Sequence, residues 1–100
     1  FRLTGDAKLV VGRNKDENEV MLALVEDADV VLEAKDYVGP VCILRGKSDD
    51  SAIATAASIA LRYSDAPKDA RSKVRVRAGG SEREIAVAPA DNGWLESIRI

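Results

Sequence analysis

The chain has no histidine, a single cysteine and few aromatic residues, and each shortage excludes a class of function. With only Cys42, no internal disulfide can form, and without histidine a zinc site of the Cys/His type is excluded. General acid–base catalysis near neutral pH would need a carboxylate or lysine with a displaced pKa, and no residue of the sequence is marked as one. Cys42 lies among Val41, Ile43 and Leu44, which predicts a buried, inert thiol. We therefore expect no catalytic residue, cofactor or metal site.

Sequence signatures of nucleotide-binding enzymes and membrane proteins are also missing. The chain contains neither a Walker loop nor a G-x-G-x-x-G fingerprint. No apolar run approaches the roughly eighteen residues that a membrane span needs, and no signal peptide is visible. Asp49-Asp50 could bind a hard cation, but two acidic residues at a helix start usually act as caps. These observations predict a non-enzymatic chain without membrane contact.

The length and composition suit one folded domain over residues 1–100, with 46% hydrophobic and 32% charged residues. Because the first residue is Phe1, we expect a fragment of a larger protein. The net charge of −2 argues against coating nucleic acid by charge alone. Residues 1–50 carry a net charge of −4 and residues 51–100 a net charge of +2. Any site for a polyanion is therefore expected to be local.

Hydrophobic periodicity predicts an α+β domain, a single mixed sheet of five to six strands with two helices packed on it. The expected strands are residues 8–12, 30–35, 41–44, 73–77 and 82–88, with a last edge strand at 94–100. The expected helices are residues 15–25 and 48–64. Gly79-Gly80 predicts a two-residue hairpin turn between the strands at 73–77 and 82–88.

The connection between the first strand and the first helix holds the least ordinary residues. Gly12 allows a sharp turn, and Asn14 with Glu17 three residues later resembles a capping box. Asn18 then lies in the first turn of an otherwise apolar helix stripe. Its amide must bond to something, either the neighbouring loop backbone or an external ligand.

These residues resemble a known RNA-binding domain. Val11-Gly12-Arg13-Asn14 followed by Asn18 is similar to the G-R-N-x-x-x-N opening of the NFACT-type domain, in the short form found at the end of proteins related to tRNA thiouridine synthases. The resemblance covers residues 8–76 and includes the order of elements. Val31 and Glu33 stand where the family often has a tryptophan and a histidine. The resemblance therefore assigns RNA contacts to Arg13, Asn14 and Asn18.

Four basic residues and one tyrosine could also contact RNA. Arg13 and Lys15 precede the first helix, and Arg45 and Lys47 precede the second. If both helices start at the same edge of the sheet, four cations and two helix N-termini would form one cationic notch for phosphate oxygens. Tyr37, in the loop between the second and third strands, could stack on an exposed base.

Basic residues also alternate along the strand at 73–77 and its approach. They are Arg71, Lys73, Arg75 and Arg77. The last three would project from one sheet face and could follow phosphates along a backbone. Alternatively, Glu84 faces Arg75 and Glu82 faces Arg77 across the hairpin, which would leave only Arg71 and Lys73 for RNA.

The resemblance implies a cytoplasmic RNA-binding accessory domain, with tRNA as its ligand, in a tRNA-modification protein of the thiolation type. The parent protein would carry a tRNA sulfurtransferase-like catalytic domain N-terminal to this fragment. The alternative is a protein–protein interaction module that docks on that domain without touching RNA. The candidate RNA-binding residues are Arg13, Asn14, Lys15, Asn18, Tyr37, Arg45, Lys47, Arg71 and Lys73.

Overall fold

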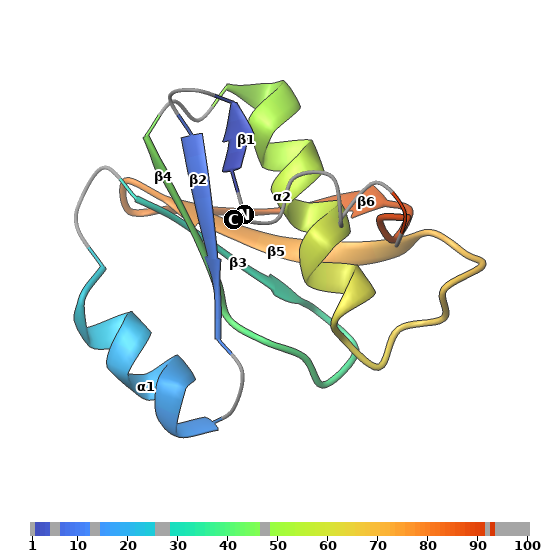
Figure 1. Ribbon diagram of the computed structural model, residues 1–100, viewed down its shortest axis with the longest axis horizontal. Coiled ribbons are helices and arrows are strands. Elements are labelled where there is room, and N and C mark those ends of the chain that lie inside the picture. Colours follow the sequence, from blue (N-terminus) through green and yellow to red (C-terminus); the bar gives the residue numbers. More distant parts are fainter. Residues whose placement is uncertain are drawn as a thin grey trace.

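The computed structural model describes residues 2–4, 7–12, 15–25, 29–46, 49–91 and 93. It has one six-stranded sheet with a helix on each face (Figure 1). The elements are β1 (Arg2–Thr4), β2 (Ala7–Val11), α1 (Lys15–Ala23), β3 (Val30–Ala34), β4 (Cys42–Gly46), α2 (Asp50–Arg62), β5 (Ser72–Ala78) and β6 (Ser81–Val87). The prediction of an α+β domain with a single sheet and two helices is confirmed.

The sheet is antiparallel throughout, so the expectation of a mixed sheet is wrong. The strand order is β1-β2-β4-β3-β5-β6. The β2–α1–β3 crossover skips over β4, and the β4–α2–β5 crossover skips over β3. Each pair of parallel strands is thus separated by an antiparallel one.

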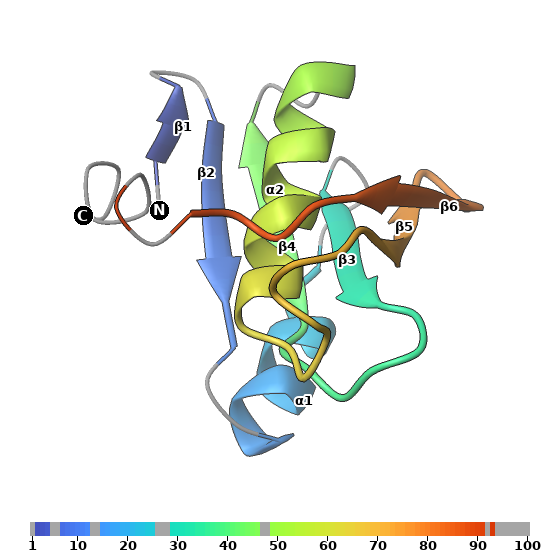
Figure 2. The same ribbon diagram turned by 90° about the vertical axis from the view of Figure 1, so that its right-hand side faces the viewer.

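This topology explains why the helices lie on opposite faces. The strands β2 and β4 run in opposite directions, so crossovers of the same right hand carry their helices to opposite sides of the sheet. Figures 1 and 2 show α2 on one side of the strands and α1 on the other. We call these the α2 face and the α1 face.

The core lies between the sheet and α2. Its largest fully buried side chains are Leu9, Leu32, Leu44, Val74, Val76 and Cys42 from the sheet, with Ile59 and Leu61 from α2. Ala56, Ala57 and Ala60 are also fully buried, so the helix backbone approaches the strands closely. Period-two alternation along residues 30–35 predicts that Val30 and Leu32 face inward, and both are part of this core.

Local chemistry accounts for the ends of several elements. The side chain of Asp49 accepts a hydrogen bond of 2.8 Å from the backbone N–H of Ala52, which confirms its expected role as a helix cap. Gly79 and Gly80 both have positive φ, +56° and +84°, and they form the predicted two-residue turn. Within the described residues, neither helix is long and apolar enough to cross a membrane.

The structure differs from the sequence expectations at β1 and at the end of α1. The strand β1 was not predicted, because three residues are too few for a periodicity. The helix α1 ends at Ala23 instead of residue 25; the acidic residues that follow oppose the helix dipole at a C-terminus. The Asn14 cap and the edge strand at 94–100 lie outside the described residues.

Candidate nucleic-acid interface

The two helices begin at opposite ends of the sheet. The last residue of β2, Val11, lies opposite Cys42 at the start of β4, whereas Gly46 at the end of β4 lies opposite Ala7. Since α1 follows β2 and α2 follows β4, their N-termini are separated by the length of the strands. The predicted cationic notch is therefore wrong, and the antiparallel pairing of β2 with β4 is the reason.

The cations predicted for that notch are correspondingly separated. Lys15 is exposed at the start of α1, at one end of the sheet, and Arg45 lies at the other end. The guanidinium of Arg45 makes two hydrogen bonds of 3.0 and 2.7 Å to the carboxylate of Asp29, which is only 4% exposed. Local pairing of this kind leaves less of the guanidinium for a phosphate. Arg13, Asn14 and Lys47 lie outside the described residues.

Asn18 bonds to the backbone of the neighbouring loop, which is one of the two alternatives that the sequence left open. Its side-chain oxygen accepts a hydrogen bond of 3.2 Å from the N–H of Val41, and the N–H of Gly12 donates to the carbonyl of Val41 at 3.0 Å. A Cβ atom added to Gly12 would lie 1.9 Å from the same Asn18 oxygen. The amide thus fastens α1 to the start of β4.

The end of the sheet where α1 begins gathers several candidate RNA-binding residues. We call it the loop end and define it as Gly12, Lys15, residues 35–41 and residues 63–73. The N–H of Lys35 donates to the carbonyl of Lys73 at 3.1 Å, and the N–H of Asp65 donates to that of Val38 at 2.8 Å. Figures 1 and 2 show α1 and the β3–β4 loop at this end, together with the connection that leads from α2 to β5.

The loop end exposes aromatic rings. Tyr37 is 39% exposed and Tyr63 is 43% exposed. Gly39 lies against Ser64, where an added Cβ would be 2.6 Å from the Ser64 side chain, so the two loops that carry the tyrosines touch. Helical periodicity over residues 48–64 predicts that Tyr63 widens the packed stripe of this helix, which is wrong: Tyr63 is the exposed C-cap residue, where α2 ends.

Not every cation at the loop end is available to a ligand. The ammonium of Lys68 donates to the carbonyls of Leu61, Ser64 and Ala66 and so closes the C-terminus of α2. Lys35 is paired with Glu84 at 2.9 Å. Arg71 donates to the backbone carbonyl of Ala86 at 2.7 Å but makes no ion pair with a described carboxylate, and exposed Lys73 makes none either.

The basic side chains of β5 lie within a charge-balanced face. The predicted register is confirmed, with Arg75 opposite Glu84 and Arg77 opposite Glu82. Arg75 bonds diagonally to Glu82 at 3.1 Å and lies 3.7 Å from Glu33. This arrangement agrees with the alternative of an ordinary solvated face instead of a phosphate ladder. The hydrogen bond between Lys35 and Glu84 raises the pKa of Lys35 and lowers the pKa of Glu84.

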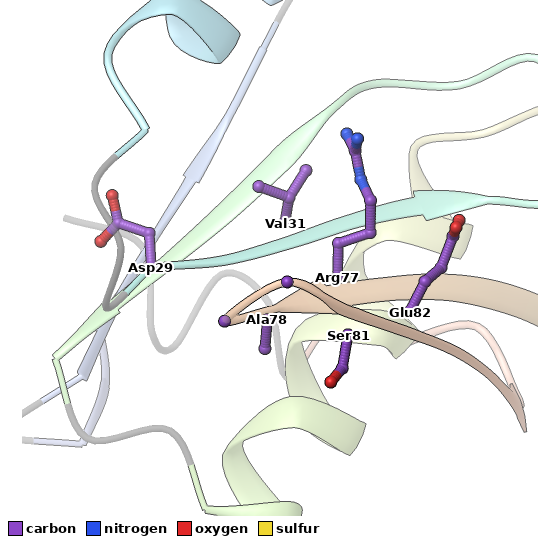
Figure 3. A pocket seen from close by; sticks show the side chains of 8 residues that line it. Asp29, Val31, Arg77, Ala78, Ser81 and Glu82 are labelled. Carbon is purple, nitrogen blue, oxygen red and sulfur yellow. The ribbon is translucent and has the colours of Figure 1, made fainter.

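A hollow of about 610 Å³ lies at the opposite end of the sheet, on the α1 face (Figure 3). Asp29, Val31, Arg77, Glu82 and the Gly79-Gly80 turn contribute to its lining. Figure 3 shows Arg77 and Glu82 rising on the same side as Val31, with Asp29 at the far side of the hollow. Both carboxylates at this hollow are already bound by guanidinium groups, Asp29 by Arg45 and Glu82 by Arg75.

Cys42, the one thiol of the chain, is buried. Burial raises the pKa of the Cys42 thiol to about 12, with a smaller contribution from the charge of Glu33, so the thiolate is not formed at neutral pH. Among the described residues, no group of three potential metal-ligating side chains comes together.

The family described as the NFACT protein RNA binding domain matches residues 1–97. This chain belongs to that family. Among solved structures, the C-terminal part of the fibronectin/fibrinogen-binding protein from Streptococcus suis is similar, with a TM-score of 0.85 at 19% sequence identity. The similarity covers 99% of this chain and 48% of that chain, so this chain spans about half the length of that structure. At this identity the likeness shows the shared fold. Among curated proteins no match was found.

Proposed function

We propose that this NFACT RNA-binding domain holds tRNA through its loop end, as the accessory domain of a cytoplasmic tRNA-modification protein of the thiolation type. Membership of the RNA-binding family is the observation that carries the proposal. Candidate residues Lys15, Tyr37, Arg71 and Lys73 lie at the loop end, and these are the ones we assign to RNA contacts. Arg45 lies at the opposite end and is assigned to the fold.

The chemistry of the loop end suits a few contacts to exposed nucleotides. Tyr37 offers a ring face for stacking, which contributes about 1–3 kcal/mol per base in single-strand recognition. Lys73 and Arg71 supply positive charge for neighbouring phosphates. Because the whole chain carries a net charge of −2, we expect moderate affinity and a shallow salt dependence that corresponds to roughly two or three phosphate contacts.

The accessory role follows from the reactive groups of this chain. Its one thiol, that of Cys42, is buried, with a pKa of about 12, and the sequence has no histidine. Sulfur transfer to a nucleotide needs an accessible nucleophile or an activated sulfur carrier. We therefore assign that chemistry to a catalytic domain elsewhere in the parent protein, and substrate retention to this one.

Fluorescence anisotropy with labelled tRNA tests this proposal. We expect Tyr37→Ala to weaken binding about fivefold or more, as loss of one stacked base does, and Lys73→Ala to weaken it and flatten the salt slope by about one unit. Lys8→Ala is the matched control. Lys8 is an exposed strand lysine at the other end of the sheet, where it lies opposite Arg45 in the neighbouring strand.

Two results would refute the assignment. Absence of tRNA binding at low salt would leave a protein-interaction module as the function. A loss of affinity in Lys8→Ala as large as that in Lys73→Ala would keep RNA binding but move it away from the loop end.

A further inference from the structure

Large exposed apolar side chains occur at two places in the described part of the chain. Three lie at the loop end, namely Tyr37, Val38 and Tyr63. The other four lie on α1, directly after it, or on β2 before it, namely Val10, Val20, Leu22 and Leu24. Apolar groups gathered in this way on a small domain indicate a contact surface.

Within the described part of the chain, the helix α1 is only partly covered by other residues. None of its residues is buried, and the inward-facing Asn18 and Met21 are only half-buried. Val20 on the helix is 59% exposed, and Leu24, in the turn directly after the helix, is 65% exposed. Nine isolated residues form a marginal helix in water, so further cover would stabilise α1.

The position of α1 is nevertheless set at both ends. Near its start, Asn18 bonds to the backbone of Val41. After its end, the carbonyl of Leu24 accepts a hydrogen bond of 3.4 Å from Arg45, which also holds the buried carboxylate of Asp29. The exposed apolar side chains are therefore presented from a fixed backbone, which reduces the entropy lost on binding.

The charges of α1 select the kind of partner. Its first half carries Asp16, Glu17 and Glu19 against Lys15 alone. Beyond Lys15 at the helix start, this negative charge disfavours RNA phosphates, and in a two-fold symmetric dimer it would meet the same charge of a second copy. A surface with basic side chains around an apolar centre complements it.

From this geometry we propose that α1 is a docking surface for a protein partner with an apolar centre and a rim of lysine or arginine. The contact involves Val20 and Leu24, with Leu22 and Val10 at its margins, and the acidic residues of α1 pair with the basic rim. Lys15, which is assigned to RNA, lies at the start of the same helix. Val20 and Leu24 are not among the residues assigned to RNA, so the proposal does not depend on RNA binding.

A 14-residue amphipathic peptide of leucine and lysine, titrated into the full 100-residue chain, provides the test; the same peptide with glutamate for lysine is the control. We expect the lysine peptide to shift the backbone NMR signals of residues 15–25 and the glutamate peptide to leave them unchanged. Leu24→Ser should weaken binding about tenfold. Val38→Ser is the matched control, since Val38 is 79% exposed at the loop end and its change should have no effect.

The outcomes separate this proposal from its competitors. Shifts confined to the loop end, or equal affinity in Leu24→Ser and the original chain, would overturn it. Self-association in sedimentation that Leu24→Ser abolishes would identify a second copy as the occupant, against the proposal. Because Leu24 lies outside the loop end, tRNA affinity should be unchanged in Leu24→Ser, so failure of either proposal can be recognised separately.

Discussion

The two helices of this domain have similar connections and opposite environments. Both link parallel strands across one inserted strand. Yet α2 buries seven of its residues and α1 buries none. The α2 face holds the main apolar core, whereas the α1 face combines a smaller buried apolar group, Val31 and Ile43, with a few hydrogen bonds and ion pairs around a half-covered helix. One face therefore supplies the stability of the fold, and the other remains available for partners.

Truncating one leucine on each helix is the strongest test of this comparison. Leu61 on α2 is fully buried, and Leu22 on α1 is 41% exposed. We expect Leu61→Ala to lower the free energy of unfolding by about 3 kcal/mol, since the fold must accommodate a cavity. Leu22→Ala should cost less than about 1 kcal/mol, because little apolar area returns to water. Urea denaturation measures both, and equal costs would contradict the assigned difference between the faces.

The contact between Gly12 and Asn18 tests how firmly α1 is held. A methyl group at Gly12 would occupy the position of the Asn18 oxygen, so Gly12→Ala must break the hydrogen bond to Val41. We expect it to cost about 2 kcal/mol from crowding and an unpaired backbone N–H. Asn18→Ala should cost about 1 kcal/mol.

The double variant should be more stable than the sum of the two changes predicts, because the alanine at position 18 leaves room for the new methyl group. Thermal unfolding of the four chains gives this coupling. Strict additivity would show that Asn18 does not fasten the helix.

The start of α2 allows a smaller test on neighbouring acidic residues. Asp49 accepts the hydrogen bond from Ala52, whereas Asp50 is exposed and lies 3.4 Å from Arg83. Asp49→Ala should cost about 1 kcal/mol, as loss of a helix cap does. Asp50→Ala should change the free energy of unfolding by less than about 0.5 kcal/mol. Chemical denaturation distinguishes the two. A larger effect at Asp50 would contradict the assignment of Asp49 as the helix cap.

The α2 face was predictable because its signals are local and repeated. Alternating apolar residues such as Val30 and Leu32 indicated the inward side of β3, and the acidic start with Asp49 indicated the helix cap. The register of the last hairpin followed from Gly79-Gly80, since a two-residue turn fixes which residues face each other. In each case a few neighbouring residues determine the outcome.

The candidate site was less predictable because it depends on strand order. The notch required both helices to start at one edge, but the order of β2 and β4 within the sheet is a long-range property that no sequence spacing encodes. The same limit applies to Arg45, whose partner Asp29 lies sixteen residues away. By contrast, the sequence alone indicates that the Asn18 amide needs a hydrogen-bond partner. Only the structure shows that this partner is the loop backbone and not an external ligand.

The smallest expected effect concerns the charged part of the α1 face. Hydrogen bonding lowers the pKa of Glu84, so the contribution of its pair with Lys35 is present above the ordinary carboxyl value of 4.5 and is lost as the pH falls through the lowered pKa. The raised pKa of Lys35 has the opposite sign: its contribution is present below 10.5 and is lost as the pH rises through the raised value.

Glu84→Gln should therefore lower the melting temperature slightly at neutral pH and leave it unchanged in strong acid. Salt should shrink the difference, because both side chains are solvated and screened. Glu19→Gln on α1 is the matched control, since it removes the same charge from a carboxylate with no ion pair among the described residues. If the melting temperatures of the two variants change with pH in the same way, the effect comes from the overall charge. The ion pair between Lys35 and Glu84 would then make no specific contribution to stability.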